Sequence, residues 1–231
     1  MKTAIVIALA WVPLVSAADP APAFRPGTRV LFQGDSITDM NRGRTADPNH
    51  ILGHSYAFLI AAKYGAMLPE RQLVFINRGV SGNTVAGLAN RWQSDTLDLK
   101  PDILSILIGI NDASRHTPLD EWEKGYAKLL ADSVASNPNL RIVVGEPFTL
   151  AVGRHKDEWE EWSSDVKQRQ AIVAKLAEKY KATLVQYQKV FDDAAKRAPA
   201  DYWIWDGIHP TYSGHQLMAD EWARVVLGED K

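Results

Sequence analysis

Five short apolar runs, separated by longer amphipathic stretches, constrain the fold of this chain more than any other feature. The runs cover residues 29–33, 72–77, 102–108, 140–144 and 182–186, and each is rich in Val, Ile, Leu or Phe. Because each run is apolar on both faces, it is typical of a strand that is buried on both sides in a parallel sheet.

Helical candidates alternate with these runs, at residues 55–64, 84–97, 119–136, 157–179 and 213–227. Parallel strands need long crossover connections, and helices provide them. The alternation therefore predicts an α/β fold, a three-layer α/β/α sandwich with a five-stranded parallel sheet. In open sheets of this kind, ligands bind at the carboxyl ends of the strands, so the residues that follow each run are the first candidates for function.

The first 18 residues have the layout of a secretory signal peptide. Lys2 precedes an apolar run over residues 4–15, and small residues lie around a cleavage site at Ala17 or Ala18. We expect residues 1–18 to be the signal peptide, residues 19–231 to form one domain, and the protein to be secreted or periplasmic. A membrane anchor is the alternative, but about 12 apolar residues that include Pro13 fall short of the roughly 20 that a span needs.

Composition narrows the classes of partner. The formal net charge of −2 gives no basic stripe, so we expect no nucleic acid partner. The six His residues lack paired-ligand spacing, so we expect neither a metal site nor a cofactor. Cys is absent, so disulfides cannot form, and no segment after the signal peptide is long and apolar enough to span a membrane. The sequence makes no prediction about the oligomeric state.

Polar residues follow the first three runs. The stretch GDSITD brings Ser36, NRGVSGNT brings Gly82, and GIND brings Asn111. Taken singly, each is also common in loops, turns or helix caps. Together they place a hydroxyl nucleophile beside two donors for an oxyanion, which is what acyl transfer needs, and each such donor contributes roughly 3 kcal/mol.

The stretch IWDGIHP, residues 204–210, supplies a carboxylate and an imidazole from one turn. Acyl transfer needs a base that titrates near neutral pH and is held in one tautomer by a carboxylate. We expect Asp206 to bind one ring nitrogen of His209, Pro210 to stiffen the exit, and the other nitrogen to face Ser36. Considered alone, the stretch is more typical of an Asx-type turn before the last helix.

The other five histidines fit the role of base less well. His50, His54 and His116 fall in loops or helix starts without a matching carboxylate. His155 lies in a charged segment that we expect to be exposed, and His215 lies in the last helix, where we expect a solvated or capping role. His209 is therefore the candidate base.

These motifs, in this order over residues 34–210, resemble the blocks of SGNH hydrolases of the GDSL esterase family. The G-x-S-x-G elbow of the α/β-hydrolases is absent around Ser36. The resemblance implies a flavodoxin-like α/β/α sandwich and a cofactor-independent esterase.

The resemblance also assigns roles. It implies that Ser36 is the nucleophile and that Asp206 and His209 complete a triad. It further implies that the Ser36 N–H, the Gly82 N–H and the Asn111 side chain form the oxyanion hole.

Longer stretches, including LFQGDSITDMNRGR and WDGIHPTYSGH, are similar to GDSL acetylxylan esterases of bacteria that degrade plant polysaccharides. This implies removal of O-acetyl groups from a carbohydrate such as acetylated xylan. A broad short-chain carboxylesterase, thioesterase or lysophospholipase of the same family is the alternative. A carbohydrate-binding module that has lost the chemistry is a third.

Three residues are candidates for substrate contact. Trp205, which directly precedes Asp206, is expected to line the pocket, because aromatic rings stack on the apolar faces of sugars. Arg42 and Arg44 follow the nucleophile and are candidates for binding a polar or acidic sugar, with solvated loop charge as the alternative. Asp35 is expected to be structural. Two residues receive no assignment from the sequence: Trp159 and Trp162.

Overall fold

The computed structural model describes residues 21 and 23–228, so the predicted signal peptide lies outside the described residues. Five parallel strands form one sheet in the order β2-β1-β3-β4-β5. This order is flavodoxin-like and confirms the predicted fold class. The strands are β1 (Arg29–Gly34), β2 (Val74–Asn77), β3 (Ile103–Leu107), β4 (Arg141–Gly145) and β5 (Thr183–Val185).

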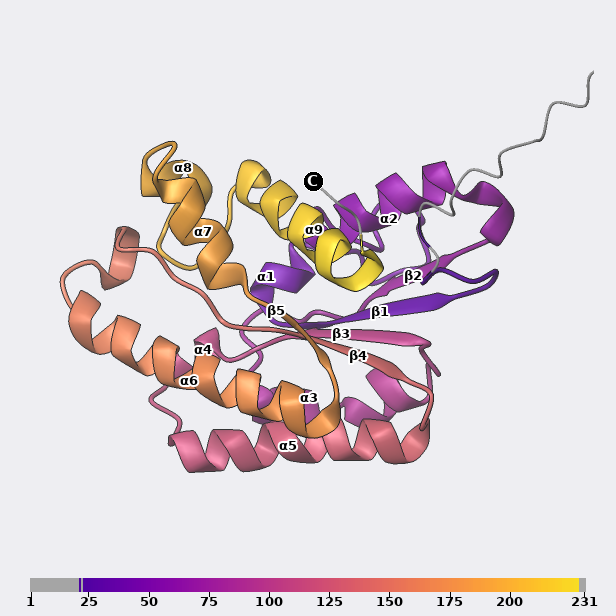
Figure 1. The fold of residues 1–231 in the computed structure, drawn as a ribbon, viewed down its shortest axis with the longest axis horizontal. Helices are drawn as coiled ribbons and strands as arrows, with labels where there is room; N and C mark the ends of the chain where they lie inside the picture. The colour runs from indigo at the N-terminus through magenta and orange to yellow at the C-terminus, as the bar shows by residue number, and fades with distance from the viewer. Residues whose placement is uncertain (1–20, 22, 229–231) are drawn as a thin grey trace, which may run out of the picture.

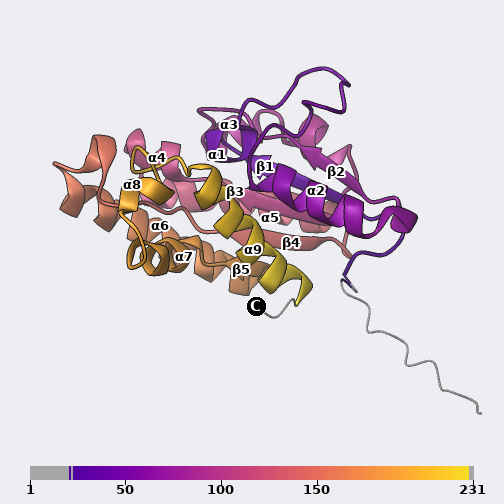
Figure 2. The ribbon, with the colours of Figure 1, turned by 90° about the horizontal axis from the view of Figure 1, so that it is seen from above.

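Helices cover both faces of the sheet (Figures 1 and 2). One face carries α2 (Tyr56–Met67), α7 (Tyr187–Ala195), α8 (Ala200–Trp203) and α9 (Tyr212–Leu227). The other carries α3 (Val85–Ala89), α5 (Leu119–Ser136) and α6 (Trp159–Tyr180). Two short helices, α1 (Ser36–Asp39) and α4 (Ile110–Ser114), follow β1 and β3 at the carboxyl edge of the sheet.

The register of the strands brings their carboxyl ends level. Gly34 at the end of β1 pairs with Leu107 at the end of β3, and Leu107 pairs with Gly145 at the end of β4. Asn77 at the end of β2 pairs with Phe32. The segments that leave β1 to β4 therefore start from one edge of the sheet.

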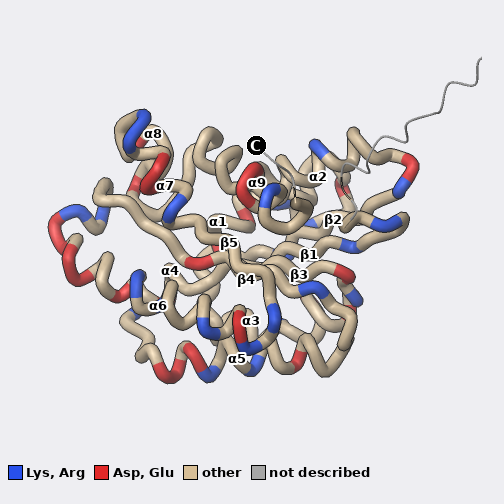
Figure 3. Tube along the Cα trace, in the orientation of Figure 1, with Lys and Arg blue, Asp and Glu red and all other residues tan. Residues whose placement is uncertain are grey.

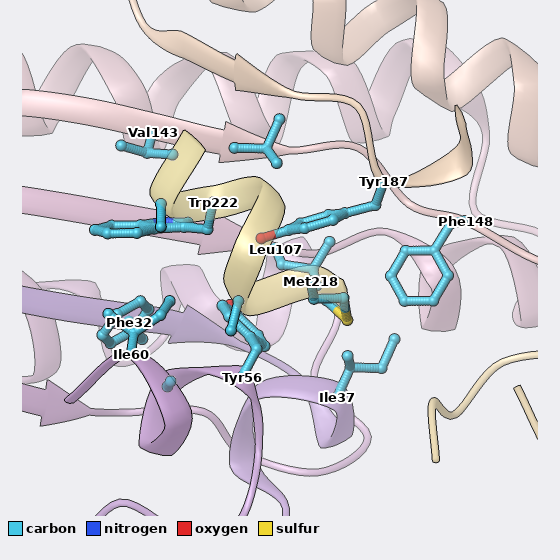
Figure 4. Packing of buried hydrophobic residues seen from close by; sticks show 14 of the residues in the cluster. Phe32, Ile37, Tyr56, Ile60, Leu107, Val143, Phe148, Tyr187, Met218 and Trp222 are labelled. Atoms are coloured by element: carbon cyan, nitrogen blue, oxygen red, sulfur yellow. The ribbon is translucent and has the colours of Figure 1, made fainter. Parts of the chain in front are cut away.

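Large aromatic side chains fill the core on both faces. Trp222 of α9 lies over the sheet with its ring 5.7 Å from that of Phe32, and its Nε1–H donates to Ser105 Oγ at 3.1 Å (Figure 4). Trp92 and Trp122 are buried on the opposite face. These three Trp residues are core residues, and the hydrogen bond removes the cost of burying the Trp222 indole N–H without a partner.

Two expectations about regular structure need correction. The edge strands β2 and β5 are only partly buried, unlike the three central strands. The helix expected over residues 84–97 is broken, because α3 ends at Ala89 and a π-helix covers Gln93–Leu97. The Gln33 side chain of β1 donates to the Asp95 carbonyl at 2.7 Å. A carbonyl of the π-helix therefore accepts a hydrogen bond from a side chain of the sheet, and such insertions disturb the regular backbone hydrogen bonds of a helix.

Acidic and basic residues are interspersed along the outer helices α5 and α6 (Figure 3). Several form pairs one turn apart, such as Lys128 with Asp132 at 2.8 Å. Pairs of this kind are typical of a solvated helix face. None of the helices in the described part of the chain is long and apolar enough to cross a membrane.

His215 of α9 is buried, so of the two roles expected for it the solvated one is wrong, and the structure has the capping one. Its Nδ1 accepts the N–H of Tyr56 at 3.3 Å, at the start of α2, and its Nε2 has no partner among the described residues. Burial, reinforced by the nearby His54 and His209, lowers the pKa of His215 to about 3. His215 therefore caps a neighbouring helix as a neutral ring.

This burial predicts a specific pH dependence of stability. The unfolded chain protonates His215 near pH 6.5, whereas the folded chain does so only near pH 3, so the contribution is constant above pH 6.5 and is lost as the pH falls. Between pH 6 and pH 4, the free energy of unfolding of the wild type should fall relative to His215→Gln by about 1.4 kcal/mol per pH unit. Urea unfolding of both proteins across this range tests it. A difference that does not change with pH would contradict it.

Candidate active site

The turn after β1 fixes the position of Ser36. Asp35 caps α1, because its Oδ1 accepts the Ile37 N–H at 3.0 Å. Gly34 leaves no room for a side chain, since a Cβ there would lie 2.4 Å from Thr38 Oγ1. Ser36 therefore starts a short helix at the edge of the sheet, partly exposed to solvent.

A single carboxylate organises the turn between α8 and α9. Asp206 Oδ1 accepts the backbone N–H groups of Ile208 at 3.0 Å and His209 at 2.8 Å, and Oδ2 lies 2.8 Å from His209 Nδ1. His209 Nε2 lies 2.9 Å from Ser36 Oγ. The Asx-type turn and the predicted triad geometry are thus the same structure, because the turn aims the imidazole at the hydroxyl.

The same contacts control the ionisation of Asp206. Desolvation on its own raises the pKa of this carboxyl, but hydrogen bonds from the His209 ring and from the backbone N–H groups of His209 and Ile208 outweigh it. The pKa is therefore held well below its usual value. Asp206 is an anion at neutral pH, so it accepts hydrogen bonds and favours the tautomer of His209 that carries hydrogen on Nδ1.

A relay of two hydrogen bonds, from Trp162 through Thr149 to the Gly207 carbonyl, connects this turn to the segment after β4 and to α6. Ile204 and Pro210 form an antiparallel bridge that closes the turn. The Gly207 carbonyl accepts from Thr149 Oγ1 at 2.7 Å, and Thr149 Oγ1 in turn accepts from Trp162 Nε1 at 2.8 Å. Trp162, which the sequence left unassigned, thus anchors the turn.

Arg154 also contacts the turn and was not predicted. Its Nη2 lies 2.9 Å from Asp206 Oδ2, and about half of its side chain is exposed. Gly153 has φ +68°, and a Cβ there would lie 2.3 Å from the Asp206 backbone, so the segment packs directly against the turn. Nothing in the local sequence links a Gly-Arg pair to a carboxylate 52 residues later.

Gly82 lies in a turn that is fixed from two sides. It adopts φ +78°, a conformation that glycine tolerates without strain. The preceding Ser81 donates both its N–H and its Oγ–H to Asp39 Oδ2, at 2.9 and 2.8 Å. On the other side, the Gly82 carbonyl accepts from Arg115 Nη2 at 2.9 Å. The direction of the Gly82 N–H is set by these contacts.

Asn111, whose side chain is also expected in the oxyanion hole, is the second residue of α4. Its Nδ2 donates to the Asn83 carbonyl at 3.0 Å. A side-chain amide carries two N–H groups, so one remains for a ligand. Within the described residues, neither this second N–H nor the N–H of Gly82 has a partner.

The three predicted substrate contacts differ in their surroundings. Trp205 is 61% exposed, and its backbone N–H donates to the His209 carbonyl, so it lies in the turn that carries His209. Arg42 is buried, and its Nε donates to the Gly79 carbonyl at 2.7 Å, so the alternative of a solvated loop charge is wrong for this residue. Arg44 binds Asp39 through two nitrogens, at 3.0 and 2.8 Å, although half of its side chain is exposed.

Two further predictions concern residues next to the site, His155 beside Arg154 and Asp35 beside Ser36. His155 was expected to be exposed, but its ring stacks on Trp162 with centroids 3.7 Å apart, and only 13% of the side chain is exposed. Asp35 is fully buried, and burial raises its pKa to about 7 despite the Ile37 N–H. Its cap on α1 agrees with the structural role predicted for it.

A Ser–His–Asp hydrogen-bond chain beside two unpaired N–H donors, at the carboxyl edge of a parallel sheet, is the arrangement of a serine acylhydrolase. Residues 32–217 match the model of the GDSL-like lipase/acylhydrolase family, and the chain belongs to this family. The resemblance drawn from the sequence is therefore confirmed, and the protein is an enzyme of the acylhydrolase and esterase type.

Relatives of known structure share most of the chain. An acetylxylan esterase from Geobacillus stearothermophilus is 31% identical over 213 residues, which cover 87% of this chain and 94% of that enzyme. A putative GDSL-like lipase from Parabacteroides merdae is 35% identical, with a TM-score of 0.81 over 88% of this chain and 97% of that one.

Two structures of the Geobacillus stearothermophilus acetylxylan esterase Axe2 are of catalytic mutants, one altered at an Asp and the other at a His three positions later. Each is 30% identical to this chain, covers 90% of it and 97% of its own length, and gives a TM-score of 0.79 or 0.77.

The contact of Arg154 with Asp206 predicts a shift in the pH dependence of turnover. In Arg154→Gln, the positive charge that lies 2.9 Å from Asp206 Oδ2 is gone. The pH of half-maximal kcat/KM on the acid side should therefore rise, by about half a unit because the guanidinium is half exposed. Arg224→Gln, which changes an exposed arginine that pairs with Glu221 near the end of α9, is the control. An unchanged profile for Arg154→Gln would show that the contact does not influence the base.

Proposed function

We propose that this protein is a serine esterase that removes O-acetyl groups from carbohydrate, with acetylated xylan or its oligosaccharides as the substrate class. The observation that carries the proposal is the hydrogen-bond chain from Ser36 Oγ through His209 to Asp206, with links of 2.9 and 2.8 Å. The similarity to acetylxylan esterases supports the choice of substrate.

The first half of the reaction forms an acyl-enzyme. His209 Nε2 takes the proton of Ser36 Oγ as that oxygen attacks the ester carbonyl carbon. Negative charge develops on the carbonyl oxygen, where the N–H groups of Ser36 and Gly82 and the Asn111 amide donate to it. The protonated His209 then gives its proton to the departing sugar oxygen.

The second half releases acetate. Water enters in place of the sugar alcohol, and His209 removes a proton from it as it attacks the acetyl carbonyl. The collapse of this second intermediate returns the proton to Ser36 Oγ. Asp206 stays an anion throughout, so it stabilises the imidazolium and does not take the proton itself.

Trp205 is the proposed contact for the sugar. It is the exposed aromatic residue nearest to the triad in sequence, and its backbone N–H is bonded to the His209 carbonyl. An indole face at this position is suited to stacking on a pyranose ring while the acetyl group reaches Ser36. We also propose that residues 1–18 direct the protein out of the cytoplasm. Outside the cell, a plant polymer is accessible to it.

The second candidate function is a broad short-chain esterase of the same family. The partly exposed Ser36 and the exposed Trp205 favour it, because neither of them restricts the alcohol part of the ester. A binding module without chemistry is disfavoured, since it has no need of an intact hydrogen-bond chain and two unpaired N–H donors.

Variants of the triad should lose activity to different degrees. We expect Ser36→Ala and His209→Ala to lower kcat about 10⁶-fold and Asp206→Asn about 10⁴-fold, because the carboxylate orients the base whereas the base transfers protons. Asn111→Ala should cost about 10² to 10³-fold. Asp201→Asn, a change to an exposed carboxylate in the same segment, is the control. Wild-type activity in His209→Ala would refute the mechanism.

The preference for the acyl group and the preference for the alcohol part of the ester can be measured separately. Acetate release from acetylated xylan and xylo-oligosaccharides should exceed the rate on p-nitrophenyl esters whose acyl chain is longer than acetyl. We expect Trp205→Ala to raise KM for the acetylated oligosaccharide about tenfold and to leave p-nitrophenyl acetate within about twofold, since stacking adds roughly 1 kcal/mol or more. Faster turnover of longer acyl chains would favour the broad esterase instead.

A further inference from the structure

A pocket of about 310 Å³ lies between the α4–α5 connection and the start of α6. The two walls come from segments far apart in sequence that lie side by side on the same side of the sheet (Figure 1). Its volume is at the lower end of the range of small-ligand sites, and it takes no part in the triad. Its lining includes Ser114, His116, His155, Glu158, Glu161 and Asp165.

Both walls are continuous with the candidate active site. One wall is formed by Ala113 and Ser114, in the same short helix as Asn111, so they lie within about three Cα steps of the oxyanion candidate. The other wall includes His155, which directly follows Arg154 and its contact to Asp206. Each wall of the pocket therefore includes residues adjacent in sequence to a residue of the candidate active site.

Some polar groups that line the pocket are hydrogen-bonded to other side chains, and others have no partner among the described residues. Glu158 binds His155 Nδ1 at 2.8 Å, and Asp165 binds Arg169 Nε at 2.8 Å. His155 Nε2 is buried and has no partner among the described residues. Glu161 makes no hydrogen bond or ion pair with the described residues, and it lines the same wall.

The free groups define the chemistry of the ligand. A carboxylate accepts hydrogen bonds only, whereas imidazoles donate and accept, so the pocket suits hydroxyl groups, which do both. Three carboxylates and no Lys or Arg line it, and this disfavours an anionic ligand. Within the described residues, no three His, Asp or Glu side chains are arranged to hold a metal ion.

The pocket wall is also connected to the triad turn by a ring stack and two hydrogen bonds. His155 stacks on Trp162, and Trp162 reaches the Gly207 carbonyl through Thr149. A side chain that lines the pocket is therefore held by the same relay that fixes the turn. Preorganised groups lose little entropy when a ligand binds.

We infer that this pocket is a subsite for a neutral sugar residue of the substrate, next to the residue that carries the acetyl group. This inference rests on the proposed function and names the part of the substrate that is bound away from the chemistry. The three carboxylates disfavour a uronic acid residue at this position.

The first test measures binding of xylotetraose, a neutral oligosaccharide without acetyl groups, by calorimetric titration. Loss of an imidazole and a carboxyl group, both of which form hydrogen bonds, in His116→Ala/Glu161→Ala should weaken the Kd about tenfold or more. Glu161→Gln, which keeps the shape of the side chain, should weaken it less. The matched control is Glu160→Ala, which removes the neighbouring exposed carboxylate that does not line the pocket. Equal Kd values for the double variant and the control would overturn the inference, as would tighter binding of tetragalacturonate than of xylotetraose.

The second test separates this inference from the proposed function. With acetylated xylo-oligosaccharides, the double variant should raise KM about tenfold with kcat and p-nitrophenyl acetate turnover unchanged. If the wild type releases no acetate from any sugar while xylotetraose binding still depends on Glu161, the subsite stands and the acetylesterase proposal fails. If acetate is released and KM for the oligosaccharide is the same in the double variant and Glu160→Ala, the subsite is overturned and the acetylesterase proposal stands.

Discussion

The parallel register of the sheet is the constraint on which the rest of the structure depends. Because β1 and β3 end level, with Gly34 paired to Leu107, the residues that leave them start side by side. Ser36 and Asn111 come from these two exits, and Gly82 comes from the segment after the neighbouring β2. An antiparallel strand in the middle would send one of these groups to the opposite edge.

Contacts between the loops then refine what the sheet brings together. Asp39, four residues after Asp35, binds the N–H and the hydroxyl of Ser81, which fixes the turn that contains Gly82. Asn111 binds the carbonyl of Asn83 at the other end of the same turn. The nucleophile loop and both oxyanion candidates thus form one hydrogen-bonded unit. In such a unit, the donors are aimed before the substrate arrives, which is the condition for electrostatic stabilisation of a transition state.

The Asp206 carboxylate has a comparable role in the last turn. Burial opposes its charge, but two backbone N–H groups and the ring of His209 favour it by more, so the charged form is stable where it is needed. The relay from Trp162 through Thr149 holds the same turn from behind. The orientation of the base is therefore a property of several segments rather than of the D-x-x-H spacing alone.

Features with a local signal were predictable from the sequence, and features made by distant contacts were not. The five strands and the amphipathic helix at Leu119–Ser136 have hydrophobic periodicity of their own, and the structure has them within about two residues. The contact of Arg154 with Asp206, the burial of Arg42 and the bond from Gln33 to the Asp95 carbonyl in the π-helix each depend on a partner from another element. No window of sequence around these residues contains that partner.

The central claim is that Ser36 is a nucleophile activated by His209. Covalent labelling with a fluorophosphonate, followed by mass spectrometry of the peptides, tests this most directly, because the reagent reacts with a serine whose proton is removed by a neighbouring base. The account predicts one label on Ser36 in the wild type and about 10² to 10⁴-fold slower labelling in His209→Ala, which is the contribution that general base catalysis makes. Labelling of a different serine, or equal rates in the two proteins, would contradict it.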